Sequence, residues 1–193
     1  MLLEKALQLI DEKNSEDPNK ETYLGKEYPK ELLYSQRMYA QLLDLEPDAS
    51  EALKIAIRAQ HIRRWEIPRK DYPANKVGYI TWRNDLKKRH ASITAEILKQ
   101  VGYAPEFIER VSFLINKKAL KNDPGTQTLE DVACLVFLEY YFESFAQKYD
   151  EEKIIDIVKK TWNKMSDKGH ECALKLGLSP TSQDLIGKAL HAS

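Results

Sequence analysis

Two histidines mark the part of the chain that is equipped for acid–base chemistry. His61 lies at the C-terminal end of an apolar helical segment that begins near Ser50, and His90 lies in a second helical segment that begins near residue 78. The ordinary pKa of imidazole lies close to neutral pH, so two histidines brought together by neighbouring helices can accept and donate protons. The sequence therefore predicts that the two helices carrying His61 and His90 form the walls of one site.

Cations and aromatic rings lie along the same stretch. The planar guanidinium of arginine suits a phosphate or carboxylate group, and aromatic rings can stack on a base or sugar. Pro68 and Pro73 interrupt the helices and create an irregular loop around which these side chains gather. This combination favours a phosphorylated small molecule, such as a nucleotide, over duplex DNA. The candidate ligand-binding residues are Arg64, Trp65, Arg69, Tyr72, Trp82, Arg83 and Lys87, with Lys118 from a separate helix.

Structural roles compete with these functional ones. A salt-bridged surface with aromatic rings packed into the core would have the same composition. Asp131 lies three residues after Thr128, as in a capping box, and His61 could donate to a carbonyl at the end of its helix. Glu139 lies in a strongly apolar helix, so we expect it to be buried against an arginine from residues 58–69.

Helical periodicity runs through most of the sequence. Residues 14–29 form a polar connection, residues 121–127 form a turn, and Thr128 caps the most apolar helix. No stretch alternates with period two for long enough to predict a strand. We therefore expect a single all-α domain over residues 1–193, a helical bundle with extra N- and C-terminal helices. Apolar residues recur at helical spacing in residues 2–13, 30–44, 50–64, 78–100, 107–117, 129–147 and 151–176, with a short helix after Pro180.

Composition excludes several classes of protein. The 193 residues include 30 basic and 30 acidic side chains, so no overall charge indicates a nucleic-acid or anionic-membrane partner. No apolar run reaches the roughly 18–20 residues of a membrane-spanning helix. The two cysteines, Cys134 and Cys172, lie on apolar helix faces rather than in a disulfide pattern. We therefore expect a soluble cytoplasmic protein without a membrane partner.

The order of these segments resembles that of HD-domain phosphohydrolases. In that family a helix with a His-x-x-Arg motif precedes an apolar helix ending in a His-Asp pair, and a further histidine and an aspartate follow. Here ELLYSQRMYAQLL and EALKIAIRAQHIRRWE match the first two helices, HASITAEILKQVGY begins with His90, and LEDVACLVFLE contains Asp131. The resemblance implies an HD-like core over about residues 30–145 and a C-terminal helical extension over about 150–193. It also implies that His61, His90 and Asp131 converge around one cavity as catalytic residues, with phosphoester hydrolysis at a divalent metal.

Two of the four metal ligands that this resemblance implies are missing. Tyr34 stands in place of the first histidine, and Ile62 stands in place of the aspartate of the His-Asp pair. His61 and Asp131 are then the matched metal ligands, whereas an open catalytic site usually keeps at least three protein ligands. We therefore expect protein purified without added metal to hold clearly less than one equivalent of a transition metal.

Three strings match a second family more specifically. QHIRRWEIPR, GYITWR and LEDVACLVFLEYY resemble the uncharacterised family called domain of unknown function 4202. This resemblance supports a shared fold but implies almost nothing about function.

Three functional hypotheses follow. The first is a divergent HD-like protein that binds or hydrolyses a phosphorylated small molecule in a basic, aromatic-rich cleft. As a hydrolase it would hold a metal or activate water with His61 and Asp131 and use His90 as an acid or base. The second is a non-catalytic binding or regulatory module that lacks the metal, and the third is a binder of RNA ends. Missing metal ligands favour the second, whereas the grouping of histidine, aspartate and arginine favours the first. A phosphate clamp would consist of Arg64, Arg69 and Lys118.

Overall fold

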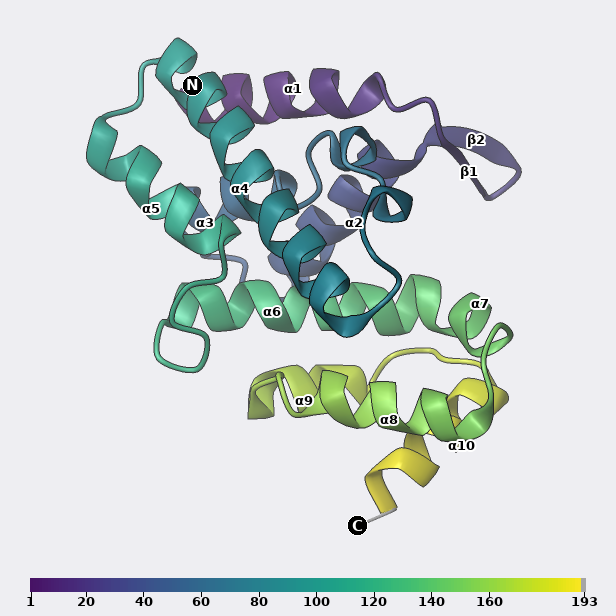
Figure 1. The fold of residues 1–193 in the computed structure, drawn as a ribbon. Helices are drawn as coiled ribbons and strands as arrows, with labels where there is room; N and C mark the ends of the chain where they lie inside the picture. The colour runs from purple at the N-terminus through teal and green to yellow at the C-terminus, as the bar shows by residue number, and fades with distance from the viewer. Residues whose placement is uncertain (192–193) are drawn as a thin grey trace. The chain divides into compact units, whose positions relative to one another are not determined.

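The computed structural model describes residues 1–191, in which ten α-helices and one two-stranded hairpin form (Figure 1). The expected all-α class is confirmed. The chain groups into two compact units, the first covering Met1–Ala119 and the second beginning at Leu120. In the described part of the chain, no helix has the length and apolar character needed to cross a membrane.

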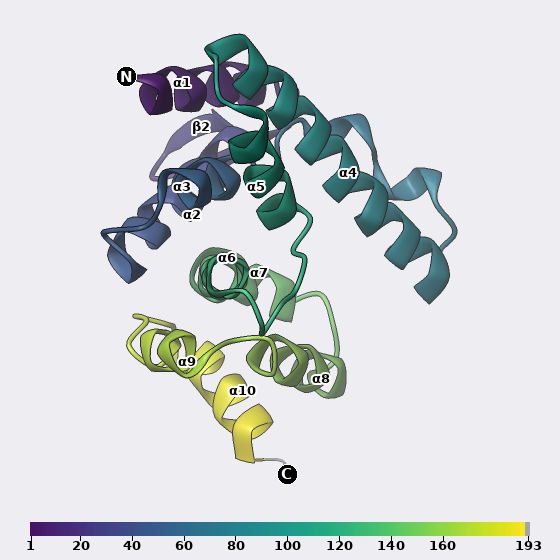
Figure 2. The same cartoon turned by 90° about the vertical axis from the view of Figure 1, so that its left-hand side faces the viewer.

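The first unit is a bundle of five helices with a hairpin inserted after the first. The longest helix, α4, packs against α5 and α1, and α3 packs against α2 and α5 (Figures 1 and 2). Large apolar side chains fill the space between them, among them the fully buried Met38, Ile57 and Leu98. The elements are α1 (Leu2–Ser15), β1 (Lys20–Tyr23), β2 (Lys26–Pro29), α2 (Lys30–Leu45), α3 (Glu51–Arg58), α4 (Lys76–Val101) and α5 (Pro105–Ile115).

The hairpin lies in the segment expected to be an irregular polar connection. Strands β1 and β2 pair in antiparallel register, with Lys20 opposite Pro29 and Tyr23 opposite Lys26. Leu24 and Gly25 form the two-residue turn, both with positive φ, as the favoured hairpin turns require. The expectation of no strands is wrong here. Four-residue strands with mostly exposed side chains are too short to show an alternating pattern.

In the second unit, the apolar side chains of Leu129, Leu135 and Phe142 are fully buried. Helix α8 packs against α10, and α6 packs against α9. A π-helical turn, Phe137–Tyr141, joins α6 to α7. The helices are α6 (Pro124–Val136), α7 (Phe142–Ala146), α8 (Glu151–Trp162), α9 (Asp167–Ala173) and α10 (Pro180–His191).

Helix α6 begins five residues earlier than expected, so the predicted cap at Thr128 is wrong, and the turn predicted over residues 121–127 is limited to residues 121–123. Pro124 is its first residue, and the Asp123 carboxylate accepts a hydrogen bond of 2.8 Å from the Thr126 amide. Aspartate as the cap followed by proline is a favourable start, because the proline lacks an N–H that would otherwise be unsatisfied.

The helix expected over residues 151–176 is divided in two. Helix α8 ends at Trp162, and Ser166 caps a new helix by accepting from the Gly169 amide at 3.1 Å. The serine hydroxyl satisfies a backbone donor that the preceding helix cannot reach, and the chain changes direction here.

Glu139 is exposed rather than buried against an arginine, so that expectation is also wrong. It lies in the π-helical turn Phe137–Tyr141, where the chain makes wider turns than an α-helix. The extra residue in this turn shifts the helical phase, and Glu139 therefore faces solvent while Leu138 is buried.

Candidate functional site

His61 lies in the turn that follows α3 rather than on the helix itself. Helix α3 ends at Arg58, and Arg63 adopts a left-handed backbone conformation with φ of 52°. Between them, Ala59 and Ile62 are fully buried and anchor the turn in the core of the first unit. Ile62 is therefore a core residue, and its burial turns the adjacent His61 ring toward α2.

Three neighbours hold the His61 ring. The Tyr34 ring stacks on it with a centroid distance of 4.0 Å and an interplanar angle of 9°. Glu31 Oε2 lies 3.1 Å from Nδ1, and Arg64 Nη1 lies 3.3 Å from Nε2. Because a guanidinium only donates, Nε2 must be the acceptor, and the Nδ1–H donates to Glu31. The surroundings therefore select one tautomer of His61.

His90 has the same tautomer for a different reason. It is 2% exposed on α4, and its Nδ1–H donates to the Ile62 carbonyl at 2.7 Å. Its Nε2 is buried and has no hydrogen-bond partner in the described part of the chain. The two imidazole centroids lie 6.1 Å apart. The prediction that His61 and His90 come together is confirmed by this distance.

Both histidines are neutral at pH 7. Burial lowers the pKa of His61 well below its ordinary value, and the charges of Arg64 and Arg83 lower it further. Burial also lowers the pKa of His90 to about 3, with a smaller contribution from His61. The bare Nε2 of His90 is therefore a lone-pair acceptor rather than a proton donor.

Two arginines beside these histidines have no salt-bridge partner within residues 1–191. The guanidinium carbon of Arg64 lies 4.7 Å from the centre of the Trp82 ring, and Arg83 donates to the Tyr79 hydroxyl at 3.3 Å. Burial lowers the pKa of Arg64, the nearby Glu31 carboxylate opposes this shift, and the charge of Arg83 adds to it. Four other arginines of the first unit are paired with carboxylates: Arg37 with Glu21, Arg58 with Asp11, Arg63 with Glu16 and Glu66, and Arg89 with Glu66.

Glu31 is a site residue that sequence reasoning missed. It is 6% exposed in the first turn of α2, and burial raises its pKa. Its backbone amide donates to Asp17 Oδ2 at 2.9 Å, which fixes the start of the helix. The available signal was its spacing from Tyr34: three residues apart on a helix, the two side chains share a face, and both contact His61.

Several predicted ligand-binding residues make hydrogen bonds that hold the loop of residues 59–75, between α3 and α4. Arg69 donates to the carbonyls of Tyr72 and Pro73 at 2.9 and 2.8 Å. The Tyr72 hydroxyl donates to Asp85 at 3.0 Å. Trp82 is 8% exposed, and its indole N–H donates to the Ile67 carbonyl at 2.9 Å. Arg69, Tyr72 and Trp82 therefore have contacts that shape the loop, whatever else they bind.

The remaining predicted residues lie outside this inner cluster. The Arg63 guanidinium lies over the Trp65 ring at 5.5 Å. Lys87 is half-buried on α4, and Lys118 is exposed in the turn after α5. Of the predicted ligand-binding side chains, Arg64, Trp82 and Arg83 are the ones that the structure places with His61.

Asp131 belongs to the second unit, where both of its carboxylate oxygens are in use. Oδ1 accepts from the Ser166 amide at 2.8 Å and from Gln127 Nε2 at 3.0 Å, and Oδ2 accepts from the Ser166 hydroxyl at 2.5 Å. The side chain is 3% exposed. These contacts hold Ser166 at the start of α9. Asp131 is therefore not part of a capping box at the start of its own helix, which Asp123 caps. Its convergence with His61 and His90, which lie in the first unit, stays a prediction.

No cluster of three or more His, Cys, Asp or Glu side chains in residues 1–191 has an arrangement that would hold a metal. The Nε2 of His61, the nitrogen that its tautomer leaves for a metal, faces the Arg64 guanidinium. A metal role for His61 and Asp131 stays a prediction.

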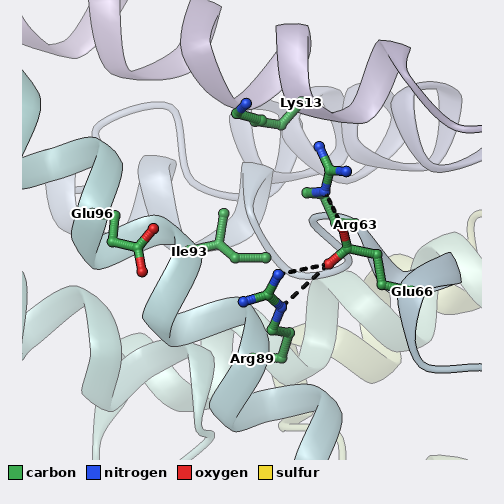
Figure 3. Close-up of a pocket in the computed structure, with 6 residues that line it drawn as sticks. All are labelled: Lys13, Arg63, Glu66, Arg89, Ile93 and Glu96. Atoms are coloured by element: carbon green, nitrogen blue, oxygen red, sulfur yellow. Dashed lines mark hydrogen bonds and ion pairs between the residues drawn. The ribbon is translucent and has the colours of Figure 1, made fainter.

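A surface pocket of about 260 Å³ lies on another face of the first unit (Figure 3). Its charges are largely paired, because Glu66 accepts from Arg63 at 2.5 Å and from Arg89 at 2.8 Å. The pocket contains no histidine, and we do not assign it the chemistry predicted for His61. Its lining residues are Lys13, Arg63, Glu66, Arg89, Ile93 and Glu96.

Comparison with known proteins gives one match. A family model described as a domain of unknown function (DUF4202) matches residues 4–186. No curated protein and no solved structure matches the chain.

Proposed function

We propose that this chain, which belongs to the family of domain of unknown function 4202, binds a phosphorylated small molecule at the His61–Arg64–Arg83 cluster. The observation that carries this proposal is the pair of arginines without carboxylate partners. Two like charges held close together, one of them mostly buried, cost free energy that a bound anion would recover. A phosphate group matches the guanidinium fork and carries the required charge.

The charges around His61 support an anion rather than a cation. Its pKa is lowered by Arg64, Arg83, Lys117 and Lys30, so four positive side chains lie within electrostatic range. Glu31 is the carboxylate at the site, and its own pKa is raised by burial. A bound phosphate would be attracted by the four cations and weakly opposed by one carboxylate.

The geometry favours the binding module over the hydrolase. The proposed HD-like core would have kept the helices that present His61 and His90, but Tyr34 stacks on His61 where that family has a metal ligand. If the protein is an enzyme, the proposed reaction is hydrolysis of the bound phosphate ester, with His61 and His90 beside the phosphate. Binding of RNA ends has less support, because the rings of Tyr72 and Trp82 are held by hydrogen bonds within the loop.

Removing Arg83 should abolish stabilisation by phosphate. A ligand at about 100 times its Kd adds roughly 2.7 kcal/mol to the free energy of unfolding, so saturating inorganic phosphate or pyrophosphate should raise the Tm of the wild-type protein by several degrees. In Arg83→Ala this rise should be lost, with the Tm of the free protein nearly unchanged, because Arg83 has one long hydrogen bond. Thermal denaturation with and without the anion provides the measurement.

Arg89→Ala is the matched control, since Arg89 lies on the same helix but pairs with Glu66. It should retain the phosphate-induced rise. The proposal fails if wild-type protein shows no rise with inorganic phosphate, pyrophosphate, nucleotides or sugar phosphates. It also fails if Arg83→Ala and Arg89→Ala respond alike.

Turnover separates the binding module from the hydrolase. We would incubate the protein with p-nitrophenyl phosphate and with each ester that raises the Tm, with and without Mn²⁺, and measure released phosphate. Release that requires Mn²⁺ and is lost in His61→Asn would support the hydrolase. Binding without release supports the module.

A further inference from the structure

We propose that the ligand is a phosphate monoester that carries hydroxyl groups, such as a phosphorylated sugar or polyol, and that the Nε2 atoms of His90 and His61 accept from those hydroxyls. This inference rests on the proposed phosphate site and names the class of ligand that fits it. The histidines supply the selectivity, while Arg64 and Arg83 supply the affinity for phosphate.

The acceptor at His90 is the independent observation. The Ile62 carbonyl accepts the hydrogen bond from the Nδ1–H of His90, so Nε2 presents a lone pair. The Nε2 atom is buried and has no donor among residues 1–191. A buried acceptor without a partner costs roughly 1–3 kcal/mol, which a ligand hydroxyl would recover. An alkyl phosphate without hydroxyls would leave this cost in place.

The Nε2 acceptor of His61 has only one weak hydrogen-bond donor, Arg64. Arg64 Nη1 lies 3.3 Å from its Nε2, longer than most N–H···acceptor hydrogen bonds. Tyr34 and Glu31 hold the ring from other sides, so the acceptor would stay in place if Arg64 moved.

Arg64 is the side chain that links phosphate binding to these acceptors. It contacts the His61 ring and acts electrostatically on His90 as well. A charge-assisted bond to phosphate is stronger than a long bond to neutral imidazole. When Arg64 turns from His61 to the phosphate, it therefore frees the Nε2 acceptor of His61, whose ring lies 6.1 Å from that of His90, for hydroxyls on the same ligand.

The test compares two esters that differ only in hydroxyl groups, glycerol 3-phosphate and propyl phosphate. Isothermal titration of the full chain should show glycerol 3-phosphate binding about tenfold tighter, the change in Kd that one hydrogen bond of about 1.4 kcal/mol produces. His90→Asn should reduce this preference several-fold and leave the Kd for propyl phosphate unchanged. Its amide N–H lies near the position of Nδ1 and can still donate to the Ile62 carbonyl, but it has no acceptor at Nε2.

His61→Asn provides a second variant should His90→Asn fail to fold, and it should also reduce the preference while keeping a donor toward Glu31. Equal affinity of the wild-type protein for the two esters would overturn this inference and leave the phosphate site standing. A preference that survives in both variants would overturn it as well. Failure of both esters and of inorganic phosphate to bind would instead remove the proposed function.

Discussion

Replacing Asp131 with alanine should lower the free energy of unfolding of the second unit by about 3 kcal/mol, because hydrogen bonds to a buried charge contribute roughly 1.5–3 kcal/mol and their orphaned donors add a desolvation cost. The variant leaves the Ser166 amide and hydroxyl and the Gln127 amide without their acceptor. Urea denaturation of the full chain, followed by hydrogen exchange of the α9 amides, provides the measurement. Protection of α9 should be lost first.

Two further variants separate this structural role from a general loss of charge. Asp156→Ala removes an exposed carboxylate paired with Lys160 one turn away, and it should cost less than about 0.5 kcal/mol. Gly169→Ala should destabilise α9 with Asp131 intact, because the added Cβ would lie 2.8 Å from Asp131 Oδ1. Unchanged stability of Asp131→Ala would show that the carboxylate is not holding α9.

Asp131 also shows where sequence reasoning ended. Its first-turn position and the nearby Thr128 suggested a cap for its own helix, a local role. The partner that it holds is Ser166, 35 positions later in sequence. The break between α8 and α9 creates this partner, and continuous apolar periodicity over residues 151–176 does not reveal it. Tertiary hydrogen bonds of this kind are determined by packing rather than by local spacing.

Helix content was predictable because amphipathic periodicity repeats over many residues, and the all-α class followed from it. The first and last residues of the helices and strands were less predictable. A short hairpin at residues 20–29 depends on the positive φ of Leu24 and Gly25, which composition does not indicate for leucine. The exposure of Glu139 depends on one additional residue in a π-helical turn, whose effect on helical phase is invisible to a count of 3.6 residues per turn.

The candidate site was predictable in its cations and histidines, and not in its carboxylate. Spacing brought Arg64 near His61 and suggested that His90 would join them, as the structure shows. It also grouped Arg69 with them, although Arg69 donates to loop carbonyls. Glu31 was overlooked because a glutamate in the first turn of a helix is ordinary, and only the turn after α3 brings His61 to it.

Acidification should destabilise the wild-type protein more than His90→Asn. The folded pKa of His90 is about 3 and its unfolded pKa is about 6.5, so between these values the unfolded chain binds a proton that the folded chain does not. Stability therefore falls as pH falls through this window. At 1.36 kcal/mol per pKa unit, His90 alone should remove about 2–3 kcal/mol between about pH 6.5 and pH 4.5.

The neighbouring charges are common to both proteins, so the difference between them isolates His90. His61 has a lowered pKa and destabilises in the same direction, whereas the raised pKa of Glu31 makes the folded state gain stability as pH falls toward the ordinary pKa of that carboxyl. Urea denaturation of both proteins at several pH values should therefore give curves that diverge below about pH 6.5, with the wild-type protein losing more stability. Parallel curves would mean that His90 is protonated as readily in the folded chain as in the unfolded one, and its Nε2 would then no longer be the bare acceptor on which selectivity for hydroxyl groups depends.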